Sequence, residues 1–367
     1  MKLKDMVIVF DDGDWIESKD QSSEGVRLLQ TGNIGEGYFV NKAERKKFIS
    51  EETFEKLKCK EVYSGDILIS RLPEPVGRAC IVPELDSRLI TAVDCTICRI
   101  NEDIVNKEYL CYFFQSQSYY NQVKQKVAGT TRKRISRKNL EQIKVYLPLL
   151  DIQGKIVQKL NTVSELISYR KKQLEDFDLL VKSQFVEMFG DPVSNSMEWR
   201  MSTLSELGEF GRGVSKHRPR NAPELLGGKY PLIQTGDIAS SQLYIKEHTS
   251  TYSELGFQQS KMWKNGTLCI TIAANIAKTA ILEFDACFPD SVVGFNANSE
   301  TNNIFMHYWF TFFQKILEKQ APESAQKNIN LKILSELKII TPPIELQNQL
   351  ATFVQQVDKS KFSCIMK

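Results

Sequence analysis

The sequence predicts a mixed α/β protein made of two tandem copies of one domain, each followed by a long helix. The first observation is an internal repeat, in which four short motifs recur in the same order. QTGNI at 30–34 returns as QTGDI at 234–238, and PLLDIQ at 148–153 returns as PPIELQ at 342–347. A period near 200 residues is too long for a solenoid repeat and fits two domains of ordinary size.

Two further motif pairs support the repeat and define its boundaries. GDILI at 65–69 returns as GTLCI at 266–270, and YLCYFF at 109–114 returns as FMHYWF at 305–310. We expect domains at residues 1–147 and 195–341, a spacer helix at 148–190 and a shortened distal helix at 342–367. A duplicated domain predicts a pseudo-twofold molecule whose two similar but non-identical surfaces suit a target with two different halves.

The second observation is a heptad pattern in the predicted spacer helix. Apolar positions recur at alternating steps of three and four residues, as in a coiled coil. The predicted seam is Leu160, Val163, Ile167, Arg170, Leu174, Phe177, Val181, Gln184 and Met188. A helix of about 38 residues is roughly 57 Å long, and Gly190-Asp191-Pro192 is expected to end it.

The distal helix repeats the start of this pattern, because Leu346, Leu350, Val354 and Val357 match Ile152, Ile156, Leu160 and Val163. At the same offset Met188 would correspond to position 382, whereas the sequence ends at Lys367. The distal helix is therefore expected to be short by about four turns. Antiparallel pairing of the two helices would then leave the seam around Ile156, Leu160 and Val163 uncovered.

Composition excludes some classes of protein. The apolar fraction of 42%, the charged fraction of 25% and the net charge of +3 are typical of a soluble globular protein rather than a polycation. No signal peptide or membrane-length apolar run is evident, so we expect a cytoplasmic protein. The CxxC pair Cys95 and Cys98 has no second pair or nearby histidine, which favours packed cysteines over a metal site.

A basic segment is the strongest binding signal. Residues 124–138 contain seven Lys or Arg and no acidic residue, centred on GTTRKRIS at 129–136. The residues expected to contact DNA phosphates and guanine edges are Thr130, Thr131, Arg132, Lys133 and Arg134. The alternative is a solvated basic loop. The second copy offers the amide-rich set Ser324, Gln326, Lys327 and Asn328, which suits adenine edges.

Signatures of catalysis are weak. The phosphate-loop motif is missing, and the three histidines, at 217, 248 and 307, have no metal-ligand spacing. Thr341-Pro342-Pro343-Ile344 superficially resembles the tetrad of amino-methyltransferases. It lacks both the amide or acid and the aromatic residue that this chemistry needs. Signatures of an enzyme are therefore mostly missing from the sequence.

Taken together, the chain resembles the specificity subunit of type I restriction–modification systems. The resemblance rests on the GTTRKRIS loop, the strand at 143–148, the heptad helix and its end FVEMFGDP at 185–192. Both copies also carry the QTGN/DI turn, which adds to the DNA-binding candidates Gln30, Thr31, Asn33, Gln234, Thr235 and Asp237.

The resemblance implies two target-recognition domains that each read one half of a split double-stranded DNA sequence. It implies an antiparallel spacer that meets modification (methyltransferase) subunits, with a restriction and translocase subunit joining through the complex. The expected spacer residues are Leu160, Val163, Ile167, Arg170, Leu174, Phe177, Val181, Leu350, Val354 and Val357. S-adenosylmethionine, ATP and Mg would be used by the partners, with no cofactor or metal on this chain and no membrane contact.

Two alternatives stay open. The chain could be a stand-alone DNA methyltransferase or nuclease with a duplicated recognition domain, although the missing cofactor motifs count against this. It could also be a coiled-coil scaffold that binds only proteins, against which the basic loop counts. The bases recognised and the gap between half-sites do not follow from the sequence.

Overall fold

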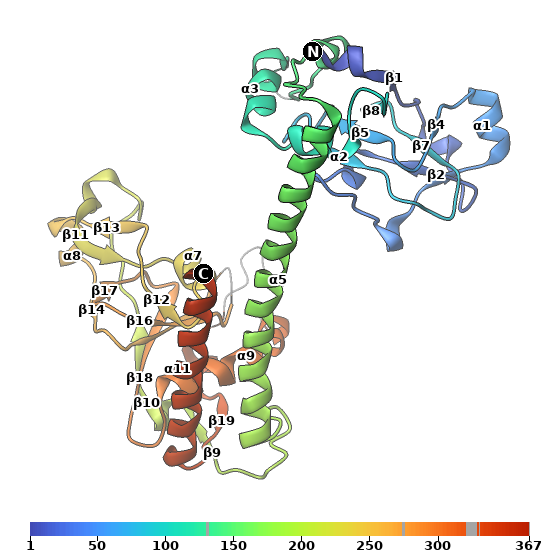
Figure 1. Ribbon diagram of the computed structural model, residues 1–367. Helices are drawn as coiled ribbons and strands as arrows, with labels where there is room; N and C mark the ends of the chain where they lie inside the picture. Colours follow the sequence, from blue (N-terminus) through green and yellow to red (C-terminus); the bar gives the residue numbers. More distant parts are fainter. Residues whose placement is uncertain (130–131, 274–275, 321–328, 330, 367) are drawn as a thin grey trace. The chain divides into compact units, whose positions relative to one another are not determined.

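The computed structural model describes residues 1–129, 132–273, 276–320, 329 and 331–366 (Figure 1). The chain divides into two compact units, Met1–Ile167 and Ser168–Lys367. The division falls inside the helix α5 (Leu150–Phe189), so each unit carries part of that helix. The finer domain boundaries expected from the sequence stay a prediction.

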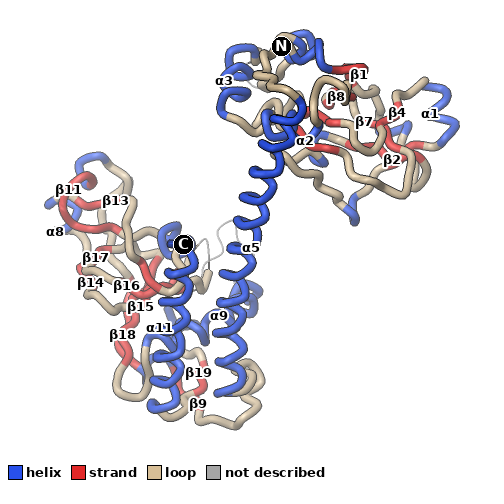
Figure 2. The backbone as a smooth tube through the Cα atoms, viewed as in Figure 1, coloured by secondary structure: helices blue, strands red, loops and turns tan. Residues whose placement is uncertain are grey.

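The described strands of the first unit form two small sheets (Figure 2). One has the antiparallel order β1-β8-β5-β6, and the other has the order β3-β2-β7-β4 with β2 and β7 parallel. The strands are β1 (Val7–Asp12), β2 (Val26–Leu29), β3 (Phe48–Ile49), β4 (Glu61–Val62), β5 (Ile67–Ser70), β6 (Ala79–Ile81), β7 (Leu89–Thr91) and β8 (Cys95–Ile100). The helices before α5 are α1 (Glu51–Leu57), α2 (Lys107–Phe113), α3 (Gln117–Lys126) and α4 (Arg137–Glu141).

The second unit repeats both sheets in the same order. The orders are β10-β18-β15-β16, with β12 added at the edge, and β13-β11-β17-β14, with β11 and β17 parallel. A further pair joins β9 (Met201–Thr203) to β19 (Lys338–Ile340), where the first unit has a single bridge between Lys2 and Lys144. This strand-by-strand agreement confirms the duplicated mixed α/β domain.

The elements of the second unit have the following bounds. Its other strands are β10 (Gly208–Arg212), β11 (Leu226–Leu232), β12 (Tyr244–Ile245), β13 (Ser250–Tyr252), β14 (Met262–Trp263), β15 (Leu268–Thr271), β16 (Thr279–Leu282), β17 (Ala286–Cys287) and β18 (Val292–Ala297). Its helices after α5 are α6 (Leu204–Leu207), α7 (Thr235–Ser240), α8 (Glu254–Gln258), α9 (Asn303–Gln320), α10 (Leu331–Ser335) and α11 (Ile344–Met366).

The central strands read as continuous apolar runs because both of their faces are buried. In β5, Ile67 and Ile69 pack with the helices, whereas Leu68 packs in the core shared with the other sheet. The CxxC cysteines follow the same alternation, since Cys98 joins the first core and Cys95 the second. Both thiols are buried on opposite faces of β8, so they cannot share a metal ion.

A buried glutamine attaches each long helix to its own domain. The Gln153 Oε1 accepts the backbone N–H of Asn106 at 2.8 Å, and its Nε2 donates to the carbonyls of Ile104 and Pro148. The Gln347 Oε1 accepts from the Thr301 hydroxyl at 2.9 Å, and its Nε2 donates to the carbonyl of Pro342.

Both glutamine side chains are fully buried, so their amide groups depend on these partners. The repeated PLLDIQ and PPIELQ motifs are thus recurrences of one structural joint. Each joint links the first turn of a long helix to the loop before α2 or α9.

The heptad prediction holds for part of α5 and is wrong near its end. Phe177 and Val181 pack in the second unit's core, as the seam predicts. In the last two turns Phe185 and Phe189 are fully buried there, whereas Gln184 and Met188 are only half-buried. A helix packed on a globular core follows 3.6 residues per turn, so the buried stripe drifts away from a 3.5-residue seam. The helix ends as predicted, with Gly190 at a φ of 74°.

Within the second unit α11 pairs antiparallel with the C-terminal half of α5 (Figure 1). The Lys361 ammonium donates to Asp178 at 2.5 Å, and the Arg170 guanidinium meets the Cys364 sulfur at 3.4 Å. Leu350, Val354 and Val357 of α11 are buried in the same core. Earlier along α5 the predicted seam residues Leu160, Val163 and Ile167 are exposed, Val163 by 52%. The expectation that Ile156 is also uncovered is wrong, because Ile156 packs against the core of the first unit.

Among the described residues, no helix is both long and apolar enough to cross a bilayer. In the same part of the chain, His, Cys, Asp and Glu side chains form no group of three that could hold a metal ion.

We predict that Gln153→Leu destabilises the first unit. Leucine keeps the approximate volume but leaves one N–H and two carbonyls unpaired, so we expect a loss of roughly 3 kcal/mol in the free energy of unfolding. Urea denaturation measures the loss, and Gln158→Leu, on an exposed turn of the same helix, is the matched control. Equal stability of the two variants would contradict the joint.

Candidate nucleic-acid interface

The basic loop of the first unit stands on a fixed base. Ala128 and Arg134 exchange backbone hydrogen bonds of 3.0 and 2.9 Å, which closes the loop. Gly129 has a φ of 102°, and a Cβ there would lie 2.4 Å from the Arg132 carbonyl oxygen, so the turn requires glycine. Ile135 follows the loop, is fully buried and donates its N–H to the carbonyl of Arg71 at 3.3 Å.

The fold brings acidic residues to a loop whose own sequence has none. Lys133 pairs with Glu74 at 3.1 Å, and Arg134 pairs with Asp94 at 3.1 Å. Arg132 is exposed and makes no ion pair with another described residue. Arg132 therefore offers a guanidinium that is not neutralised by another described residue. An anion that binds Lys133 or Arg134 must compete with Glu74 or Asp94. Thr130 and Thr131 lie outside the described residues.

Behind the loop lies a buried arginine. The Arg71 side chain is 5% exposed and faces Asp12 at 3.4 Å. Burial lowers the pKa of its guanidinium, and the nearby Asp12 carboxylate opposes that shift. Arg71 therefore supports the base of the loop through its backbone and is not positioned to reach an external ligand.

The QTGN/DI turns are capping structures. In the first unit the Gln30 N–H donates to the Asn33 Oδ1 at 2.9 Å, and the Asn33 Nδ2 donates to the carbonyl of Val40. In the second unit the Gln234 N–H donates to Asp237 at 2.8 Å, and the Thr249 hydroxyl donates to the same carboxylate. These bonds explain why the third polar position is Asn or Asp.

The same contacts separate the turn residues into two groups. Asn33 is buried, and both ends of its amide are engaged within the chain. Thr31 and Thr235 are half-buried, and Gln234 is exposed. DNA contacts by Gln30, Thr31, Asn33, Gln234, Thr235 and Asp237 stay predictions, and the structure gives Asn33 and Asp237 an intramolecular role.

Arg78 is a residue that sequence reasoning missed. Its buried guanidinium donates to the carbonyls of Ile34 at 2.7 Å, Thr31 at 2.9 Å and Pro73 at 2.8 Å. It thereby ties the QTGNI turn to the loop before β6. An arginine bonded only to carbonyls belongs to no motif, so only the position after Gly77 at the start of a repeated strand could have drawn attention to it.

The second unit keeps the anchor of the variable loop. Ile329 is buried and donates its N–H to the carbonyl of Ile272 at 2.9 Å, which matches Ile135 and Arg71 in the first unit. The candidates Ser324, Gln326, Lys327 and Asn328 lie outside the described residues. Both units therefore hold the end of this loop with the same kind of backbone bond.

A family model described as the type I restriction modification DNA specificity domain matches residues 1–176 and again residues 196–365. The chain belongs to this family. Each match begins at or near the start of one copy of the duplicated domain and includes the long helix or part of it.

Curated relatives share low but extended similarity. The EcoBI specificity subunit of Escherichia coli is 22% identical over 293 residues, which cover 71% of this chain and 61% of that protein. A Haemophilus influenzae protein named as a type I restriction enzyme specificity subunit is 23% identical over 63% of this chain and 60% of that protein. The chain thus spans about three fifths of the length of these relatives.

Solved structures share the fold across the whole chain. One, from work on complex assembly and conformational transition of the type I R-M system, has a TM-score of 0.61 at 19% identity and covers 100% of this chain and 92% of that one. The type I restriction–modification S subunit from M. genitalium has a TM-score of 0.55 at 14% identity, with 100% and 90% covered.

We predict that Arg78→Met loosens the first recognition turn. Methionine cannot donate to the carbonyls of Thr31, Ile34 and Pro73, so we expect a loss on the order of 3 kcal/mol in the free energy of unfolding. Hydrogen exchange should rise at residues 30–40. Arg45→Met, at an exposed arginine of the same unit, should change neither measurement. Unaltered exchange in Arg78→Met would refute the role of this residue.

Proposed function

We propose that this chain is the DNA-binding specificity subunit of a type I restriction–modification complex and recognises a split target through its two domains. One observation carries the proposal. The two units share their sheets and the buried isoleucine anchor, yet the loop on that anchor is cationic in the first copy and amide-rich in the second. A common scaffold with divergent loops is what reading two different half-sites requires.

In this proposal the chain supplies recognition and its partners supply the chemistry. Modification subunits would transfer the methyl group from S-adenosylmethionine to adenine, and a restriction subunit would use ATP and Mg for translocation and cleavage. Family membership and the names of the relatives support this division of labour. The long helix α5, whose residues 160–167 include exposed apolar side chains, would meet the modification subunits.

The alternatives differ in measurable ways. A stand-alone methyltransferase would bind S-adenosylmethionine without partners, and calorimetry on the purified chain should detect no such binding if the proposal holds. A protein scaffold would bind duplex DNA no better than an inert protein. A gel-shift series at rising salt separates that case, because phosphate contacts make DNA affinity fall steeply with salt concentration.

We predict that Arg132→Ala weakens DNA binding more than Lys133→Ala or Arg134→Ala. Arg132 is exposed and unpaired among the described residues, whereas Lys133 and Arg134 already face Glu74 and Asp94. If it contacts one phosphate, its loss should lower the slope of log affinity against log salt by about 1. Fluorescence anisotropy with a duplex DNA at several salt concentrations measures the slope.

Removing the acidic partner of Lys133 sharpens this test. Glu74→Gln should free Lys133 and raise DNA affinity, and Arg45→Ala should leave affinity unchanged as a matched control. Equal effects of Arg132→Ala and Arg45→Ala would refute the loop as a contact site.

We predict that the two copies read independently. Replacing residues 1–147 with the first domain of another family member should change one half of the methylated sequence and leave the other half and its contacts intact. Methylome sequencing of a cell that expresses the chimera with its modification partner gives both half-sites at once. A simultaneous change in both halves would contradict one reader per domain.

A further inference from the structure

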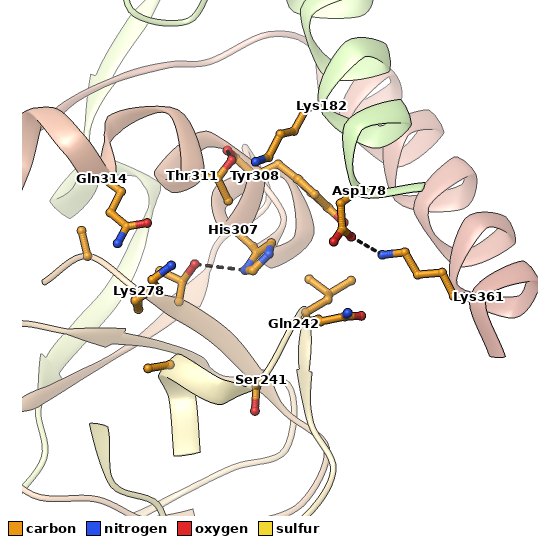
Figure 3. Close-up of a pocket in the computed structure, with 14 residues that line it drawn as sticks. Asp178, Lys182, Ser241, Gln242, Lys278, His307, Tyr308, Thr311, Gln314 and Lys361 are labelled. Carbon is orange, nitrogen blue, oxygen red and sulfur yellow. Dashed lines mark hydrogen bonds and ion pairs between the residues drawn. The ribbon is translucent and has the colours of Figure 1, made fainter. Parts of the chain in front are cut away.

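The second unit contains a pocket of about 220 Å³ that has no assigned role (Figure 3). It lies between α5, α9 and α11 on one side and the segments that lead into β12 and β16 on the other. Its lining includes the polar side chains Asp178, Lys182, Lys278, Thr279, His307 and Lys361. All of them belong to the second unit.

Among the side chains that line the pocket, positive charges outnumber negative charges. Lys361 has a side chain only 7% exposed and pairs with Asp178 at 2.5 Å, with Asp358 farther away at 3.7 Å. Lys182 and Lys278 also line the pocket, and neither makes an ion pair with another described residue. Asp178 is the one carboxylate among the lining residues. Two exposed ammonium groups of the pocket lining are therefore left without an ion-pair partner among the described residues.

A neutral histidine forms the floor of the pocket. His307 is buried, and its Nδ1 lies 3.0 Å from the hydroxyl of Thr279. Burial lowers the pKa of the imidazole to about 4, and the cations Lys361 and Lys182 add to the shift, whereas a hydrogen bond with the Thr279 backbone and the Asp178 carboxylate oppose it. When the Thr279 hydroxyl donates to Nδ1, the ring carries its proton on Nε2 and can donate to an acceptor.

The first unit has no counterpart of this chemistry. The strand register makes Ala79 of the first copy the equivalent of Thr279 in the second, and the helix caps make Cys111 the equivalent of His307. Arg78 stands where the second unit has Lys278, and its guanidinium is turned inward onto backbone carbonyls. Lys278 is instead exposed. Among the described residues, the Thr279, His307 and Lys278 side chains of this pocket therefore have no chemical equivalents in the first copy.

We propose that this pocket binds a phosphate-sized oxyanion, held by Lys182 and Lys278 and by a hydrogen bond from the ring of His307. An oxyanion offers several acceptors to cationic donors, and such charge-assisted bonds are stronger than neutral ones. The Lys361–Asp178 pair fixes one wall of the site. The phosphate group could belong to a small molecule or to the backbone of a nucleic acid, and the two sources are separable by experiment.

The first experiment uses the full-length chain and inorganic phosphate. Calorimetry at pH 7.5 should show saturable binding at one site, with sodium chloride of equal ionic strength as the blank. Replacing Lys182 and Lys278 together with Met should weaken phosphate binding at least about tenfold, because each charge-assisted bond contributes more than a neutral one. Both lysines are exposed, so the double variant should keep its thermal midpoint. Lys216→Met, at another exposed lysine of this unit, is the matched control and should bind as the parent does.

The second readout is the titration of His307 by NMR, with sulfate as the probe because it keeps two charges at low pH. A bound anion stabilises the imidazolium, so the pKa of His307 should rise from about 4 when sulfate is added and should not rise in the double lysine variant. No saturable phosphate binding, or an unchanged His307 titration, overturns the proposal.

DNA binding by the same double variant identifies the source. A lower salt slope, together with competition between DNA and free phosphate, assigns the site to a backbone phosphate. Unchanged DNA binding with lost phosphate binding assigns it to a free phosphate compound. Because the phosphate assay needs no DNA, its result stands apart from the fate of the DNA-recognition proposal, which the Arg132 variants test in the other unit.

Discussion

The structure depends on one repeated interaction, the buried amide that joins each long helix to its domain. A helix start leaves backbone groups without partners, and a neighbouring loop does the same. Gln153 and Gln347 meet both needs at once, since a single amide carries donors and an acceptor. Because both side chains are buried, the alternative to this geometry is several unpaired polar groups. Each domain therefore fixes the direction in which its own long helix leaves it. The loops of that domain consequently keep a fixed orientation relative to the start of the helix.

Within each domain, some structural features are the same in both copies and others differ. The constant part is the pair of sheets and the isoleucine that follows the variable loop, Ile135 or Ile329, bonded to the segment after β5 or β15. In the first copy the described loop residues Arg132, Lys133 and Arg134 are exposed, so their charge can change at little cost to folding. The QTGN/DI turn is constant for another reason, since its third polar side chain caps the turn from within. A motif that recurs in both copies is thus more informative about the scaffold than about the bases read.

The sequence was sufficient for the duplicated domain, the long helix and its end at Gly190, because these depend on local patterns and on comparison of one half with the other. It was not sufficient for the charge state of the basic loop, since Glu74 and Asp94 reach Lys133 and Arg134 only through the tertiary fold. The burial of Phe185 and Phe189 was missed because a heptad was extended onto a helix that packs on a globular core. Arg78 was missed because a buried arginine bonded to carbonyls leaves no trace in sequence spacing.

Duplication also explains how the two copies could acquire different chemistry at equivalent places. Ala79 and Cys111 are buried in the first copy, and the second copy has the hydrogen-bonded polar pair Thr279 and His307 at the equivalent positions. Burial of that pair is tolerable because the Thr279 hydroxyl meets the imidazole Nδ1 and the ring stays neutral, its pKa lowered to about 4 mainly by desolvation. Arg78 donates its guanidinium N–H groups to backbone carbonyls, whereas Lys278 is exposed and its charge is available to a ligand. Because backbone hydrogen bonds hold the shared scaffold, individual side chains can differ between the two copies. Each copy can therefore change its chemistry independently of the other.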